Sequence, residues 1–526
     1  MIFKKKLSVE DRIHFLTHGG REKISREALE AYAASPHSPE RRNFLKKLAA
    51  ATTGFVLTPS IFEILSRKVL AESGCEPFDP TAGESSRPPV IELHARGGDH
   101  YAADIAVGLS GSEDLLSGQD AYILHGMPQG LDIRALGFDN APQIGGIRFH
   151  NQQAALYRGL NDNLLPGVKD HLGGMVVCAS IGSDTDQVAL TGTHLYPLLG
   201  RTGTLNNMVG NRPTPTGGSY QLALGPRLAN STPYVLRNRE SVLALGGLGI
   251  LFDSSLGLAN DRAMEILRVG ARMSERSLAE FTNLSLSDQV KELVRCGYIQ
   301  SAELPAEFSE GTLFDDASAD LATAFGGNPN QSSIAAVSHA VLSNFAGFGA
   351  CTDFGHDPHD GSAQAGWNAR NRTGRLLAQI LNYAHLRSKP VFVIVLTDGA
   401  MRPANQNNPE TQSFTNSAGG STTETRWAGD SDRRTLVFGY FYHPNYSTSQ
   451  ILRNTRQVQI GGFDANGVIH NSAITTQVQN VPLAFAYNYL SLLGQEDEIA
   501  DVSLSRGNPF EGPNEEIYRI FRKLGG

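Results

Sequence analysis

The sequence predicts an α/β fold in which a mostly parallel central sheet is sandwiched between helices. Along residues 90–526, short apolar runs alternate with segments whose apolar residues recur at helical spacing, and this order is typical of a parallel sheet covered on both faces. The run Val391–Thr397 is apolar almost throughout, as expected of a central strand that is buried on both sides. The chain holds 55 glycines in 526 residues, which indicates many tight turns and long loop insertions.

Six other segments carry the short apolar runs expected of strands. They are Val90–His94, Ala121–Leu124, Met175–Ile181, Gly249–Phe252, Gly347–Phe354 and Thr435–Tyr442. Helices are expected where apolar residues recur three and four positions apart. These segments are Asn151–Leu160, Asp261–Val269, Ser332–Asn344, Val481–Leu493 and a stripe from Leu376 to Ala384. Residues 403–426 are polar, so we expect a long surface loop there, in a position where loops often line a site.

The first 71 residues differ in charge from the rest of the chain. They carry 13 basic and 7 acidic residues, a net charge of +6, whereas the remainder carries 32 basic and 46 acidic residues, a net charge of −14. An acidic body argues against nucleic acid or an anionic membrane as the main partner. We divide the chain into a basic extension (1–40), a signal segment (41–71), a polar linker (72–89) and the α/β domain (90–526).

The signal segment begins with Arg41–Lys47, RRNFLKK, which resembles a twin-arginine export signal. The apolar run that follows, Leu48–Phe62, has 15 residues, fewer than the roughly 20 that span a membrane, so it is typical of a signal. We therefore expect the twin-arginine translocase to export the folded protein to the periplasm or beyond. About forty residues precede the arginines, which leaves open an uncleaved signal that anchors the protein. The alternative is a basic amphipathic helix on a cytosolic protein.

The four cysteines form no CxxC pair, which argues against a zinc knuckle or a dithiol redox motif. They are Cys75, Cys178, Cys296 and Cys351. All follow the export signal, where disulfides are able to form. Cys178 and Cys351 lie in predicted strands, however, so we expect these two to be buried and unpaired.

Aspartates and histidines gather where the predicted strands end. The densest cluster follows Gly347–Phe354, and others include Asp99 after the first strand, Asp398 after Val391–Thr397 and Asp432 shortly before Thr435. The members of the dense cluster are Asp353, His356, Asp357, His359 and Asp360. Sites in parallel sheets form at the carboxyl ends of strands, and Asp with His suits zinc, manganese or iron, whereas carboxylates alone suit calcium or magnesium. Taken singly, each cluster also fits a polar loop with capping aspartates.

The same residues carry a resemblance to a known family. In order, the matching stretches are Val90–Asp99, Phe149–Asn151, Gly355–His359, Leu396–Arg402 and Gly429–Asp432 with Leu436–Gly439. They resemble motifs of a twin-arginine-exported bacterial family. In the same order, these motifs are an opening strand with an Arg-Gly-Gly-x-Asp turn, Leu-His-Pro, Gly-Phe-Asp-Thr-His, Ser-Glu-Phe-Gly-Arg, and Gly-Thr-Asp-His-Gly with the strand after it. That family is called domain of unknown function 1501 and is grouped with the alkaline phosphatase superfamily. The series holds across most of residues 90–445.

The resemblance implies an alkaline-phosphatase-like fold with Asp99, Asp357, His359 and Asp398 as ligands of a divalent cation such as zinc, manganese or calcium. Asp432 stands where the family has the histidine of Asp-His-Gly, and we include it in the expected ligand set. Asp398 likewise replaces a glutamate. No hydroxyl residue is marked as a nucleophile; the available ones are Ser110, Ser112 and Thr193.

Two functions remain open at this point. The first is an exported metal-dependent hydrolase of a phosphate or sulfate ester, in which cations stabilise charge on the reacting oxygens. The second is a non-catalytic binding or structural protein on the same fold, with a degenerate metal site and a protein partner. A third pattern, Asp253-Ser254-Ser255, is similar to the metal-adhesion site of von Willebrand A domains. Gly257 stands where that site needs its second serine, so a helix cap is the simpler interpretation.

Overall fold

The computed structural model describes a large part of the α/β domain. The described residues are 87–108, 119–127, 138–180, 203, 206–213, 233–238, 241–242, 319–327, 332–356, 358, 361–397, 399–405, 410–416, 419–429, 435–464, 480–501, 510 and 515–525. The predicted signal segment, the linker apart from its last three residues, and the predicted elements Gly249–Phe252 and Asp261–Val269 lie outside them. No helix among the described residues is long and apolar enough to cross a bilayer.

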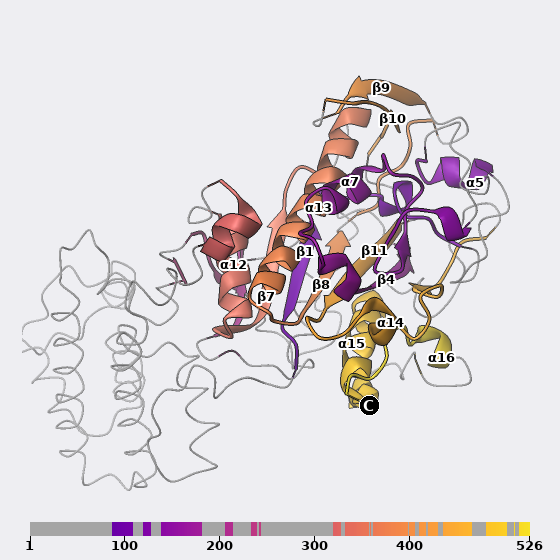
Figure 1. The fold of residues 1–526 in the computed structure, drawn as a ribbon. Coiled ribbons are helices and arrows are strands. Elements are labelled where there is room, and N and C mark those ends of the chain that lie inside the picture. The colour runs from indigo at the N-terminus through magenta and orange to yellow at the C-terminus, as the bar shows by residue number, and fades with distance from the viewer. Residues whose placement is uncertain are drawn as a thin grey trace, which may run out of the picture. The chain divides into compact units, whose positions relative to one another are not determined.

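An eight-stranded sheet forms the centre of the domain (Figure 1). Its strand order is β12-β4-β11-β8-β1-β7-β5-β6. The strands are β1 (Val90–Ala95), β4 (Leu172–Ala179), β5 (Asn206–Gly210), β6 (Tyr234–Val235), β7 (Ala346–Asp353), β8 (Val391–Thr397), β11 (Thr435–Tyr442) and β12 (Gln459–Ile460). Only β11 runs antiparallel to its neighbours in this sheet, which confirms the mostly parallel sheet that the sequence predicts.

Two small sheets and several helices complete the described part. The small sheets pair β2 (Gln143–Ile144) with β3 (Ile147–Arg148), and β9 (Thr411–Thr415) with β10 (Ser421–Thr425). The α-helices are α5 (Gln119–Leu124), α7 (Ala155–Asn161), α12 (Ser333–Leu342), α13 (Ala363–Leu386), α14 (Thr448–Ile451), α15 (Asn480–Leu493) and α16 (Glu515–Tyr518). The 3-10 helices are Tyr101–Ala103, Phe138–Asn140, Val168–His171 and Glu496–Asp501.

Helices cover both faces of the central sheet, because successive residues of a strand point to opposite sides. On one face, Gly349 of β7 lies against α12, where an added Cβ would come within 2.9 Å of Val337 and of Val341. On the other face, Phe392 of β8 stacks on Tyr489 of α15 with ring centroids 6.3 Å apart. The central strands are buried along their whole length, as a doubly covered sheet requires.

The long helix α13 is fixed at its start and along its length. The side chain of Ser362 accepts a hydrogen bond from the Ala365 backbone N–H, 3.1 Å away, and so caps the first turn. Further along, α13 packs closely on α7, since a Cβ at Gly159 would lie 2.0 Å from the backbone oxygen of Asn371. Only a glycine allows the two helix backbones to approach this closely, and the contact fixes where the polar side chains of α13 lie.

Most of the predicted elements that lie in the described ranges are confirmed, and two expectations are corrected. Ala121–Leu124 is not a strand; it belongs to the helix α5. Residues 403–426 are not an irregular loop throughout, because they contain the hairpin of β9 and β10. The short strands β5, β6 and β12 have no counterpart among the predicted elements.

The direction of β11 decides at which edge of the sheet its first residue lies. If β11 were parallel to β8, the residues just before it would lie at the edge where β8 begins, away from the polar residues that follow β1, β7 and β8. Because β11 is antiparallel to β8 and β4, its first residue, Thr435, lies at the edge where β1, β7 and β8 end. We call this edge the carboxyl edge.

Candidate functional site

Asp99 lies at the carboxyl edge, on the loop that follows β1. Its backbone N–H donates to the Thr397 hydroxyl oxygen at the end of β8, 3.0 Å away. The hydroxyl of Thr435, at the start of β11, donates to the backbone oxygen of Asp99 over 3.2 Å. The loop is therefore tied to two neighbouring strands, and the Asp99 side chain is completely buried.

A line of three side chains joins Asp99 to the end of β7. Asp99 Oδ2 lies 2.6 Å from His356 Nδ1, and the other ring nitrogen, Nε2, lies 2.8 Å from Asp353 Oδ2. The hydroxyl of Thr373 on α13 lies 3.5 Å from His356 Nε2. Both nitrogens of the imidazole thus face carboxylates, and the ring is held from both sides.

The two carboxylates favour the charged form of His356. Burial on its own lowers the pKa of His356, but the hydrogen bonds to Asp353 and Asp99 outweigh it and raise the pKa to about 9. Burial raises the pKa of Asp353, whereas His356 and Arg372 lower it, and the net shift is downward. An imidazolium between two carboxylates is therefore the favoured state near neutral pH in the absence of a bound cation.

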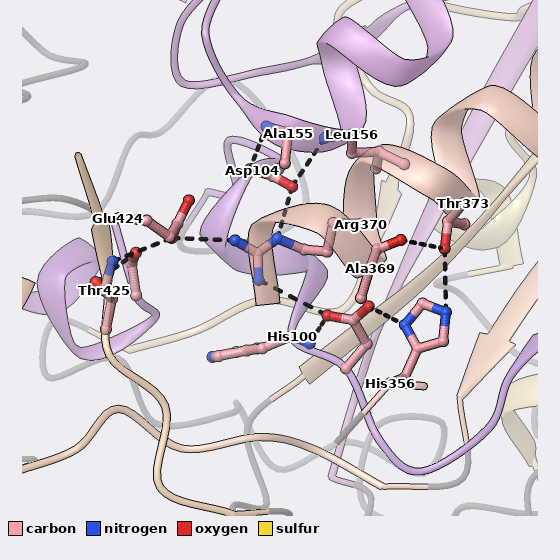
Figure 2. A network of polar contacts seen from close by, with 12 residues as sticks. His100, Asp104, Ala155, Leu156, His356, Ala369, Arg370, Thr373, Glu424 and Thr425 are labelled. Atoms are coloured by element: carbon pink, nitrogen blue, oxygen red, sulfur yellow. Dashed lines mark hydrogen bonds and ion pairs between the residues drawn. The ribbon is translucent and has the colours of Figure 1, made fainter. Parts of the chain in front are cut away.

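Arg370 of α13 connects this line to a second group of acidic residues (Figure 2). Its Nε lies 2.8 Å from Asp104 Oδ2, its Nη2 lies 3.0 Å from Glu424 Oε1, and its Nη1 lies 3.8 Å from Asp99 Oδ1. The guanidinium carbon is 5.2 Å from the ring centroid of Trp427. Arg370 is completely buried, so its charge is balanced by these carboxyl groups rather than by water.

Asp104 has a second role at the start of α7. Its two carboxylate oxygens accept hydrogen bonds from the backbone N–H groups of Ala155 and Leu156, each 3.1 Å away (Figure 2). An acidic side chain at this place satisfies N–H groups that have no partner within the helix and interacts favourably with the helix dipole. The α7–α13 pair is thereby joined to the loop after β1.

Glu424 reaches the network from the hairpin strand β10. Burial raises the pKa of Glu424, and the attraction of Arg370 reverses this only in part, so that the pKa is about 8. The side chain is 5% exposed in its ion pair with Arg370. Glu424 thus lies beside the Arg370 guanidinium, in a place where burial opposes its charged form and the arginine favours it.

The structure describes one of the five metal ligands that the sequence predicts. This is Asp99, whereas Asp357, His359, Asp398 and Asp432 lie outside the described residues. Ser110, Ser112 and Thr193, the hydroxyl residues considered as nucleophiles, lie outside them as well, as do Asp253 and Ser254. The expected ligand set therefore stays a prediction.

Asp99 and His356 present a carboxylate oxygen and an imidazole nitrogen, which are atom types that ligate divalent cations. Within the described ranges, no group of three or more His, Cys, Asp or Glu side chains is arranged to hold a metal ion. The pair nevertheless places a carboxylate oxygen beside an imidazole nitrogen, and the opposite nitrogen of that ring contacts Asp353. This carboxylate–histidine arrangement commonly orients a histidine ligand of a metal.

Sequence reasoning missed most of the network that surrounds Asp99. The sequence places His356 and Asp353 in the dense cluster, but the resemblance does not imply either of them as a metal ligand. Arg370, Asp104 and Glu424 were not singled out at all. The available signal was the spacing of Arg370 from Trp367 and Leu377, which places it on the buried face of α13, but a lone arginine in a helix usually lies on its solvated face.

The two cysteines that the structure describes agree with expectation. Cys178 in β4 and Cys351 in β7 are free and buried, and burial raises the pKa of both thiols. Cys75 and Cys296 lie outside the described residues. Buried thiols with a raised pKa are poor nucleophiles, so neither cysteine suits a catalytic role.

Comparison with known proteins yields no match: no family model, no curated protein and no solved structure is significantly similar to the chain. The class that the fold itself defines is an α/β protein with a large, mostly parallel eight-stranded sheet and polar residues at its carboxyl edge.

Proposed function

We propose that this chain is an exported, cation-dependent hydrolase of a phosphate or sulfate ester, with its site at the carboxyl edge of the central sheet. The observation that carries the proposal is the pairing of Asp99 Oδ2 with His356 Nδ1, 2.6 Å apart, where β1 and β7 end beside β8. Ligands bind at this edge in α/β proteins. The proposed fold relationship is to the alkaline phosphatase superfamily, through the motif series that includes Asp99.

The residues at this edge suit a divalent cation of the zinc or manganese type. Asp99 and His356 would hold it together with the predicted ligands Asp357, His359 and Asp398, and Asp432 is the remaining predicted ligand. A nitrogen donor beside carboxylates favours zinc or manganese over calcium, which prefers oxygen. When bound, such a cation polarises an ester oxygen and stabilises the charge of the leaving group.

Asp353 and Thr373 act on the ring of His356. Asp353 contacts Nε2, which fixes the ring orientation and leaves Nδ1 directed at Asp99. A metal ligand must present a lone pair, so His356 would have to give up its Nδ1 proton to hold a cation. The proposal therefore includes release of a proton on cation binding below pH 9, the region in which the free imidazole is charged.

Export is part of the proposed function. The RRNFLKK segment supports delivery by the twin-arginine translocase to a periplasmic or secreted location, with an uncleaved signal as a further state of the same protein. That route carries folded proteins, which suits a site that takes up its cation before transport.

Hydrolysis of chromogenic aryl phosphate and aryl sulfate tests the reaction. The full-length protein should cleave one of the two esters, lose the activity in a chelator and regain it with zinc or manganese. Asp99→Asn should abolish the activity, because it removes a charged ligand. Asp162→Asn is the matched control, since Asp162 is exposed at the end of α7. Activity that survives the chelator, or that survives Asp99→Asn, would contradict the proposal.

A second candidate function is a non-catalytic binding or structural role for a protein partner, with the network serving stability alone. The observation that favours it is the internal pairing of the network: Asp99 Oδ1 accepts from the His100 N–H at 2.7 Å while Oδ2 faces His356. Absence of hydrolysis together with a large loss of stability in Asp99→Asn would support this candidate over the first.

A further inference from the structure

Three arginines and one exposed phenylalanine gather at the carboxyl edge, beside the buried network. Arg96 follows β1, Phe354 follows β7 and Arg212 follows β5. These strands are parallel neighbours in the order β1-β7-β5, so the residues after them meet at one edge. The third arginine is Arg372 on α13, which donates through Nη2 to the backbone oxygen of Phe354.

Phe354 brings the two outer arginines together. The guanidinium carbon of Arg212 lies 4.5 Å from the ring centroid of Phe354, and that of Arg96 lies 5.4 Å from it. Both distances are within the range of cation–π attraction. The phenyl ring is 39% exposed, so it is not a core residue, and it holds two like charges at the surface of the edge.

These two arginines differ in their partners from several other arginines of the described part. Arg370, Arg387 and Arg426, for example, each contact a carboxylate within 4 Å. Across the parts of the chain that the structure describes, neither Arg96 nor Arg212 has such a partner. Arg372 does pair with Asp353, at 2.8 Å. Two guanidinium groups that contact one phenyl ring, with no carboxylate partner among the described residues, favour an anion beside them.

We propose that Arg96, Arg212 and Phe354 form an oxyanion-binding patch that recruits the phosphate or sulfate group of the ligand. Guanidinium groups match tetrahedral oxyanions by paired N–H donors. The patch is close in sequence to the site, because Arg96 is three residues before Asp99 and Phe354 is two residues before His356. The inference rests on the proposed function for the identity of the ligand as an ester, although anion binding itself needs no cation.

Binding of inorganic phosphate and inorganic sulfate to the full-length protein tests the patch. Isothermal titration calorimetry is run on chelated and on cation-loaded protein, for the wild type and for Arg96→Gln and Arg212→Gln. Each substitution removes one charge from an exposed or half-buried side chain, and each should weaken anion binding about tenfold, or 1.4 kcal/mol, with the double variant weaker still. Added salt should weaken wild-type binding in the same direction.

Arg375→Gln is the matched control. Arg375 is exposed on α13, the helix that carries Arg372, and its removal changes the net charge by the same amount, so wild-type affinity is expected there. Arg212→Lys should restore part of the affinity, since it keeps the charge but loses the paired donors. Unchanged far-ultraviolet circular dichroism and melting temperatures show that the variants are folded.

The outcomes separate this inference from the proposed function. If the double variant binds phosphate and sulfate as the wild type does, or the wild type binds neither at millimolar concentration, the patch is refuted even where the ester is hydrolysed. If the arginine variants lose binding in chelated protein while no ester is cleaved, the patch stands and the hydrolase proposal fails. Equal weakening in Arg375→Gln would also refute the patch, because net charge alone would then explain the effect.

Discussion

Replacement of Arg370 by methionine should destabilise the domain more than replacement of any surface arginine. Methionine keeps an unbranched apolar side chain but removes the guanidinium that lies 2.8 Å from Asp104 and 3.0 Å from Glu424. Both carboxyl groups are at most 5% exposed, so water cannot replace the lost partner. Removing one member of a buried ion pair costs about 3–5 kcal/mol, and we expect the free energy of unfolding to fall by that amount at pH 8.

Urea denaturation followed by tryptophan fluorescence measures this effect. The chain has two tryptophans, and one of them, Trp427, lies against Arg370, so the signal reports on the network itself. The matched control is Arg375→Met on the exposed side of α13, where a change within about 0.5 kcal/mol is expected. A loss below about 1 kcal/mol in Arg370→Met would refute the reasoning, since the buried carboxylates would then have no need of the guanidinium.

Three more predictions follow from the described contacts. In chelated protein, the raised pKa of His356 stabilises the fold fully below pH 6.5, and this stability is lost as the pH rises to about 9. The free energy of unfolding of the wild type should therefore fall by at most about 3 kcal/mol across this range, and His356→Gln should remove most of that fall. A variant whose free energy of unfolding falls as steeply as that of the wild type would contradict the assignment. Gly159→Ala should lower the free energy of unfolding by about 1–3 kcal/mol, because the added Cβ would lie 2.0 Å from the backbone oxygen of Asn371. If the variant unfolds at the same urea concentration as the wild type, the close approach of α7 and α13 is contradicted. Burial lowers the pKa of His443, and the charge of His171 lowers it further, so the contribution of His443 to stability falls as the pH drops below 6.5. Thermal melts at pH 7 and pH 5 should therefore show a smaller drop in melting temperature in His171→Asn than in the wild type. An equal drop in the two proteins would exclude the coupling between the two histidines.

The central strands could be predicted from the sequence because burial on both faces leaves a continuous apolar run. Val391–Thr397 and Thr435–Tyr442 match β8 and β11 at both ends. The strand predicted at Ala121–Leu124 was wrong because a short apolar run fits a buried helix as well as a strand. The hairpin within residues 403–426 was missed because its strands, TQSFT and STTET, are polar and half exposed, and only their alternation and threonine content favoured strands.

The site was predicted only as far as chain order allows. The position of Asp99 at the carboxyl edge could be predicted because it closely follows the strand Val90–His94 that the sequence predicts. Its contacts with His356, 257 residues later, and with Arg370 depend on the strand order, which no local pattern encodes. The contact of Glu424 with Arg370 could be predicted even less, because an acidic residue in a polar stretch gives no sign that it will be buried against an arginine.

Metal content of the purified full-length protein tests the central claim most directly. Elemental analysis should find at least one zinc or manganese ion per chain in the wild type and in Asp162→Asn. The same measurement should find the ion lost from Asp99→Asn and reduced in His356→Gln, since both would remove a ligand. A wild type without stoichiometric metal after reconstitution, or an Asp99→Asn variant that keeps the wild-type content, would contradict the account.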